Sequence, residues 1–141
     1  MRVFGKKNEL AEYEGKKEIY AVIFDNKGYI GVLSNGNESV LPMCEIENID
    51  EANLENQIQN YFFKKYNINI EKINLVDKAV EFLKDDDKIK HIEYYYTGQV
   101  QDDIIGSCPL MWYSPSRAMS TLTHEAHSWI IRQTIENLID L

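Results

Sequence analysis

A group of carboxylates at the start of one predicted helix could bind a divalent cation. Glu51 and Glu55 lie four residues apart and so share one face of a helix over 50–66, and Glu47 and Asp50 precede them. Oxygen ligands of this kind suit Mg²⁺ or Mn²⁺. A solvated acidic face is the favoured interpretation of the same four residues, because charged residues clustered on a helix usually face water.

Two tyrosines on a predicted strand could stack on a flat ring such as a nucleobase. A strand over 89–100 has side chains that alternate between its faces, so core packing should account for some of its rings. The two faces carry these residues: Ile92, Tyr94 and Tyr96 on one, and His91, Glu93 and Tyr95 on the other. Tyr94 and Tyr96 are the stacking candidates.

Histidines and cysteines complete the residue types that could do chemistry. His124 and His127 lie three apart and could share a metal, but their spacing is not that of the zinc-protease motif. Cys44 and Cys108 do not form a zinc-binding spacing, and two free thiols are typical of a cytoplasmic protein.

The elements that must position these residues follow from hydrophobic periodicity and turn chemistry. The helix over 50–66 has an apolar stripe and ends at Asn67, a residue that tolerates the left-handed conformation. Ser114-Pro115 resembles a helix N-cap followed by proline, and Thr123 is expected to cap the last helix. Strands are expected at 19–24, 29–33, 39–41, 68–82 and 89–100, with a charged turn at 84–88 and a last helix that runs towards Leu138.

This order of elements predicts an α+β domain, an α/β/α sandwich in which a mixed sheet carries helices on its faces. The 141 residues form one domain, 1–141. A formal net charge of −8 argues against a nucleic-acid partner, because phosphate backbones attract basic proteins. Membrane attachment is not expected either, since the sequence lacks a long apolar run.

Several segments resemble the Nudix hydrolase family and together cover nearly the whole chain. Residues 20–28 are similar to the family's first strand and hairpin, and Leu41-Pro42 to the Leu-Pro before its three glycines. Ile46-Glu47 matches the Ile-Glu that follows those glycines. Residues 112–118 resemble the family's tryptophan with a short helix, and residues 122–129 the closing helix of one bacterial subgroup. That last likeness makes the two helical histidines packing residues.

The resemblance implies a catalytic box that ends in Arg-Glu-U-x-Glu-Glu-x-Gly-U, where U is aliphatic. Its glutamates hold the metal that neutralises a diphosphate and activates water. Here Met43-Cys44-Glu45 replaces the three glycines. If Asn67 stands at the last box glycine, the three helical glutamate positions hold Tyr61, Lys64 and Lys65.

A second register, counted forward from Pro42, places Gln59, Phe62 and Phe63 at those positions. Neither register leaves a carboxylate there. Lysines would repel a cation but could meet a phosphate directly. The alternative is that Lys64 and Lys65 favour the helix end and point to water.

Three functions follow, and we keep all three open. The leading hypothesis is a Nudix domain with an impaired or inactive box that binds a nucleotide or nucleotide-sugar. The second is an active hydrolase of a nucleoside diphosphate derivative that uses Mg²⁺ or Mn²⁺ on Glu47, Asp50, Glu51 and Glu55. The third is a structural or interaction protein without a ligand. The family resemblance also suggests a homodimer.

Overall fold

The computed structural model describes residues 1–84, 88–102 and 107–139, so residues 85–87 of the expected charged turn lie outside the described part. Helices and strands follow one another in this order: β1 (Arg2–Phe4), β2 (Glu14–Phe24), β3 (Ile30–Asn35), β4 (Glu38–Val40), β5 (Met43–Cys44), the 3₁₀ helix η1 (Glu51–Asn53), α1 (Leu54–Tyr66), β6 (Ile70–Glu81), β7 (Ile89–Val100), β8 (Leu110–Tyr113), α2 (Pro115–Thr121) and α3 (Glu125–Ile139).

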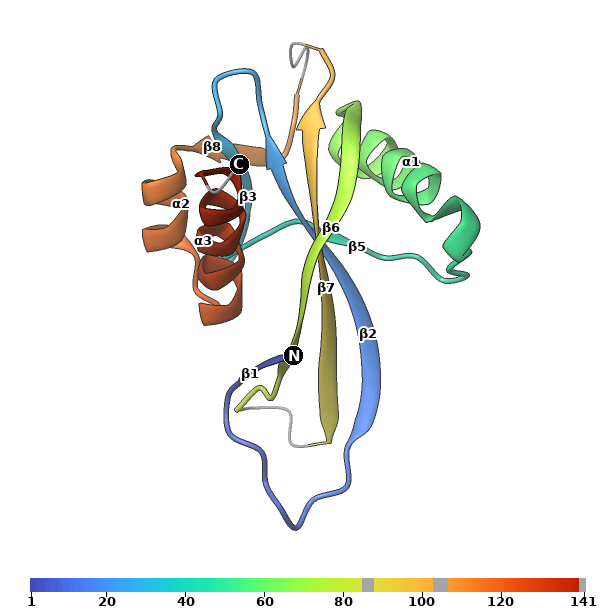
Figure 1. Ribbon diagram of the computed structural model, residues 1–141, viewed down its shortest axis with the longest axis vertical. Helices are drawn as coiled ribbons and strands as arrows, with labels where there is room; N and C mark the ends of the chain where they lie inside the picture. Colours follow the sequence, from blue (N-terminus) through green and yellow to red (C-terminus); the bar gives the residue numbers. More distant parts are fainter. Residues whose placement is uncertain (85–87, 103–106, 140–141) are drawn as a thin grey trace.

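One mixed sheet forms the centre of the described structure (Figure 1). Its strand order is β1-β6-β7-β2-β3-β4, while β5 pairs with β2 and β8 pairs with β3. The long strands β2 and β7 run parallel, with Glu14 opposite Ile89 and Phe24 opposite Gln99. β6 and β7 are antiparallel. The mixed sheet predicted from the sequence is therefore confirmed.

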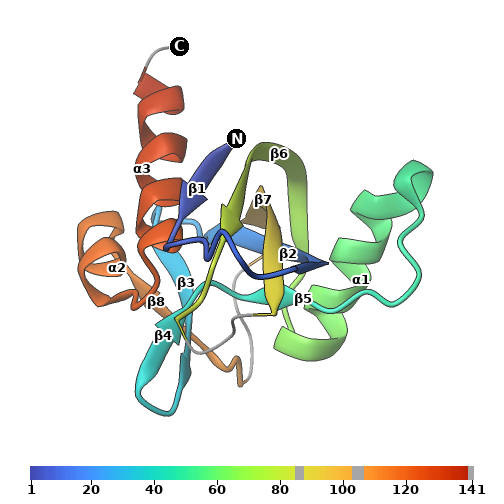
Figure 2. The same cartoon turned by 90° about the horizontal axis from the view of Figure 1, so that it is seen from below.

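Helices cover both faces of this sheet, α1 on one side and α2 with α3 on the other (Figures 1 and 2). Each side has its own apolar core. The α1 side buries Ile19, Ala21, Ile23, Leu54, Ile58, Phe62 and Tyr66 among others. The α3 side buries Val22, Ile30, Leu41, Tyr95, Ala126, Ile130 and Ile131 among others. The α/β/α sandwich is confirmed, and none of the helices formed by the described residues combines the length and apolar character that a membrane crossing requires.

Element boundaries departed from the sequence-based expectation where charged residues continue a strand. The strand expected at 19–24 begins at Glu14, because residues 14–18 pair with β7 although most of their side chains are exposed. Strands β1 and β8 were not predicted, because each is short and is stabilised only by distant partners. Ser114 does cap α2, since its hydroxyl accepts a hydrogen bond from the Arg117 N–H at 3.3 Å.

Candidate functional site

The backbone at the end of α1 bears on the two box registers that the sequence analysis left open. Asn67 has φ 58° and ψ 38°, and its N–H bonds to the carbonyls at the end of the helix. This left-handed conformation is the one that glycine or asparagine adopts after a helix. Asn67 is therefore the helix stop, as predicted, and Ile68 after it is buried.

Aromatic rings fill the space between the last turns of α1 and β5. The Tyr66 hydroxyl donates a hydrogen bond to the Met43 carbonyl at 3.0 Å. Its ring lies 5.0 Å from the Phe62 ring and 6.0 Å from the Tyr61 ring, centroid to centroid. Burial raises the pKa of Tyr66, so the hydroxyl keeps the proton that it donates. This part of α1 is joined to β5 by neutral groups.

The four acidic candidates lie at the opposite end of the helix and are exposed. Asp50 accepts hydrogen bonds from the Ala52 N–H at 3.2 Å and from the Asn53 side chain at 2.9 Å, so it caps η1. Glu51 forms an ion pair with Lys17 at 3.2 Å. Across residues 1–84, 88–102 and 107–139, no three histidine, cysteine, aspartate or glutamate side chains converge as a metal site requires.

Lys64 and Lys65 stand exposed in the last turn of α1. This position suits two ammonium groups, because the carboxyl end of a helix carries partial negative charge. The structure does not bring the lysines together with the acidic candidates, because about two and a half helical turns separate the two groups. A ligand that reached both would have to span the length of α1.

A cleft of about 390 Å³ opens between β2 and the chain that follows β5, and we call it the β2–β5 cleft. It is lined by Lys16, Lys17, Glu18, Ile19, Met43, Cys44, Glu45, Ile46, Glu47 and Ile49. Glu47 is the only one of the eight proposed site residues in this lining. Lys16 and Lys17 of β2 are cations in this lining that the sequence analysis missed.

Lys17 also connects the cleft to one of the stacking candidates. Its Nζ lies 4.4 Å from the centre of the Tyr94 ring, and Lys78 Nζ lies 5.1 Å from the same centre. Tyr96 is half-buried against the α1 core, and this burial raises its pKa. Two ammonium groups therefore already lie close to the Tyr94 ring, which was expected to stack on a ligand.

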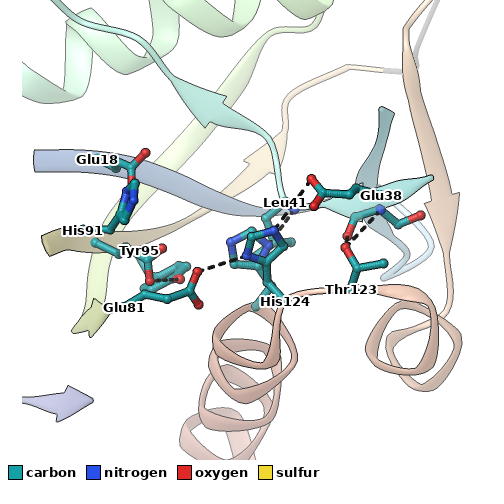
Figure 3. A network of polar contacts seen from close by, with 11 residues as sticks. Glu18, Glu38, Leu41, Glu81, His91, Tyr95, Thr123 and His124 are labelled. Carbon is teal, nitrogen blue, oxygen red and sulfur yellow. Dashed lines mark hydrogen bonds and ion pairs between the residues drawn. The ribbon is translucent and has the colours of Figure 1, made fainter. Parts of the chain in front are cut away.

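A buried polar layer lies on the other face of the sheet, between the strands and the start of α3 (Figure 3). It contains all three histidines of the chain. Its members are Glu18, Glu81, His91, Glu93, Tyr95, His124 and His127. Glu18 and Glu93 are directly opposite each other on β2 and β7, and Glu81 lies opposite His91 on β6 and β7.

Each ionisable group of this layer is held by a short contact. Glu18 lies 2.7 Å from His91 Nδ1, and the Tyr95 hydroxyl donates to Glu93 at 2.9 Å. Burial, with the nearby charge of Glu81, raises the pKa of Glu93 to about 8. Glu93 therefore carries a proton at neutral pH, which avoids three adjacent buried charges.

His127 is packed as the resemblance implied, and it also binds backbone. Its Nδ1 accepts a hydrogen bond from the Leu41 N–H at 3.2 Å, and burial lowers its pKa to about 3.

The expectation that Thr123 caps the last helix was wrong. The Thr123 hydroxyl donates to the Ser39 carbonyl at 3.1 Å, and so it ties the α2–α3 connection to β4.

Comparison with solved structures identifies the architecture. The NUDIX domain of Shewanella oneidensis NrtR, in complex with ADP ribose, superposes with a TM-score of 0.66 at 18% identity over 91% of this chain and 89% of that one. A MutT protein from Bacillus halodurans gives 0.65 at 12% identity over 82% and 79%. The C. elegans Ap4A hydrolase gives 0.65 at 14% identity over 86% and 97%. The chain has the Nudix fold. No family model matches the sequence, and neither does any curated protein.

The left-handed conformation of Asn67 is one that glycine also adopts after a helix, so it favours the first of the two box registers, in which Asn67 stands at the last glycine. Phe62 is completely buried and Ile68 nearly so, as the two aliphatic box positions require. In that register, the three helical glutamate positions would be occupied by Tyr61, Lys64 and Lys65. A ring and two ammonium groups do not fit a divalent cation, which takes oxygen ligands.

The sequence analysis missed the polar layer because its carboxylates come from three separate strands. Glu18, Glu81 and Glu93 are far apart in the chain and meet only through strand pairing. One signal was present in the sequence, the alternation that puts His91, Glu93 and Tyr95 on one face of the strand.

Proposed function

We propose that this Nudix-fold domain binds a nucleoside diphosphate derivative of the ADP-ribose type and does not hydrolyse it. One observation supports the proposal: Asn67 is left-handed, as a glycine after a helix commonly is, which favours the register in which Lys64 and Lys65 replace the paired glutamates of the box. An ammonium group repels a metal ion but attracts the phosphate that such an ion would otherwise bridge. The cocrystal of the NrtR NUDIX domain with ADP ribose supports this class of ligand.

The positions of the acidic residues favour binding over relocated catalysis. Asp50 and Glu51 are engaged in a helix cap and an ion pair. Glu47 and Glu55 are exposed and are not joined to them by any described contact. A metal that used these four side chains would have to break both existing contacts and draw four separate carboxylates together.

Titration calorimetry with ADP-ribose in the presence of a chelator tests the binding. We expect saturable binding that weakens as salt is added, because exposed charges are screened. Lys64→Glu should weaken it about tenfold, which corresponds to about 1.4 kcal/mol. Lys7→Glu makes the same charge change in the exposed segment between β1 and β2, far from α1, and should leave the affinity unchanged.

Two results would overturn the proposal in favour of the other functions. Turnover of nucleoside diphosphate derivatives that requires Mg²⁺ or Mn²⁺ and is lost in Glu55→Gln would establish the hydrolase. Absence of both binding and a ligand-induced rise in melting temperature would leave the structural protein, because a ligand that binds only the folded state stabilises it. The homodimer stays a separate proposal, and light scattering after gel filtration would contradict it by giving the monomer mass.

A further inference from the structure

His124, the residue before α3, lies between two carboxylates (Figure 3). Its Nδ1 is 3.0 Å from Glu81 of β6, and its Nε2 is 3.9 Å from Glu38 of β4. A neutral imidazole has a single N–H and can face only one carboxylate as a donor. Both contacts are favourable at once only when His124 carries its second proton.

The surroundings of His124 are mostly acidic. Glu93 of β7 adds a further carboxyl group to those of Glu81 and Glu38. Glu125 of α3 and Lys84 after β6 line the same surface pocket, of about 450 Å³. The hydrogen bond to Glu81 is the largest influence and raises the pKa of His124 above its usual 6.5. The charge change of His124 therefore falls at a higher pH than that of an ordinary histidine.

His127, one helical turn later, must stay neutral beside it. The two imidazole rings are stacked, with centroids 4.9 Å apart and planes 17° apart. Because His127 Nδ1 accepts the Leu41 N–H, its own proton must sit on Nε2. Burial and the neighbouring His124 both lower the pKa of His127. The pKa of His124 is raised and that of His127 is lowered, so His124 is the histidine of the pair that takes up the proton.

Together these residues hold one short segment, which we call the strap, residues 38–41. Glu38 pairs with His124, Ser39 bonds to Thr123 through both backbone and hydroxyl, and Leu41 bonds to His127. The strap leads through Pro42 into β5, whose Met43 and Cys44 line the β2–β5 cleft. A change that makes the strap more mobile should therefore also make the β5 side of that cleft more mobile.

We propose that His124 is a pH-operated latch, which as an imidazolium fastens the strap to the start of α3 and on losing its proton releases Glu38. The Glu81 contact is shorter and buried, with a side-chain exposure of 7%, so it keeps the remaining N–H. The Glu38 contact is longer and its side chain is 59% exposed, so it is the one that opens. The latch does not depend on the proposed ligand, because it is tested by measuring the opening of the strap in the protein without a ligand.

The sign of the pH effect follows from the raised pKa. Fastening is complete below pH 6.5 and is lost as the pH rises through the higher pKa of folded His124. Glu93 titrates at about 8 and would also change the charge nearby, so the experiment uses a Glu93→Gln background beside the wild type. An exposed ion pair contributes little, so the opening should change only about two- to fivefold.

Hydrogen–deuterium exchange of the full chain, followed by mass spectrometry, measures the opening. Protection factors, corrected for the intrinsic effect of pH, are compared for peptides covering residues 38–41 at about pH 6 and about pH 9. We expect protection to fall about two- to fivefold with rising pH in the wild type and in Glu93→Gln. Glu38→Gln and His124→Gln should show low protection at both values. Glu125→Gln, which removes an exposed charge from the same pocket, should behave as wild type.

Nuclear magnetic resonance titration of the imidazole gives a second, independent measurement. The pKa of His124 should lie above 6.5 and should drop in Glu38→Gln, a surface change that leaves the core intact. Wild-type protection that is equal at both pH values would overturn the latch. So would a Glu38→Gln protein whose strap protection and His124 titration both match the wild type.

Discussion

The two faces of the sheet are both buried, but different interactions stabilise them. On the α1 face, Phe62 and its neighbours pack apolar against apolar, and the charges stay at the surface. On the α3 face, carboxylates and imidazoles are buried among rings and aliphatic side chains. Strand β7 contributes to both, since Tyr94 and Tyr96 project one way and Glu93 and Tyr95 the other. The difference teaches that burial by itself does not make a face apolar; polar groups can be buried when each has a partner or loses its charge.

The largest effect on stability is expected from removing a buried side chain on the α1 face. Phe62→Ala should reduce the free energy of unfolding by about 3–5 kcal/mol, because it leaves a cavity under α1. Phe63, the next residue, is 55% exposed, and Phe63→Ala should change stability by less than about 0.5 kcal/mol. Urea unfolding of both variants measures the contrast, and similar losses would show that α1 does not pack as described.

On the α3 face, the ionisation of Glu93 should make the free energy of unfolding depend on pH. Folded Glu93 keeps its proton up to a pH of about 8, whereas the unfolded chain loses it near 4.5. This contribution to stability is therefore fully present below 4.5 and is lost as the pH rises to about 8. Glu93→Gln mimics the protonated carboxyl and should flatten this decline, as measured by urea unfolding across that range.

Glu125→Gln is the matched control for this experiment, because Glu125 is an exposed glutamate on α3. Its pH profile should keep the wild-type slope. If Glu93→Gln kept that slope as well, Glu93 would be ionised in the folded protein, and the polar layer would hold three charged carboxylates.

The smallest effect concerns the residue that ends α1. Asn67→Ala should cost about 1 kcal/mol, because a β-carbon disfavours the left-handed conformation, whereas Asn67→Gly should cost less. Both variants lose the same side-chain bond to the Ser107 carbonyl, so the difference between them isolates the backbone. Thermal unfolding measures it, and equal stabilities would contradict the left-handed cap that supports the proposed box register.

Much of the fold was predictable because its signals are local. The helical stripe from Leu54 to Phe62, the stop at Asn67, the Ser114 cap and the strand over 89–100 each depend on residues within a few positions of one another. The candidate site was predictable only in part. The sequence allowed two box registers, and the left-handed backbone of Asn67 favours the one on which the proposed function rests.

By itself, the sequence determined the Nudix-like order of elements, the acidic charge and the lysines at the end of α1, since periodicity and composition are properties of neighbouring residues. Only the tertiary structure decided that Glu18, Glu81 and Glu93 would share one buried layer, and that Thr123 and the two helical histidines would bind the strap. Strand register joins residues as far apart as Glu18 and His91, 73 positions along the chain. No local pattern encodes such a pairing, because it follows from how the whole sheet assembles.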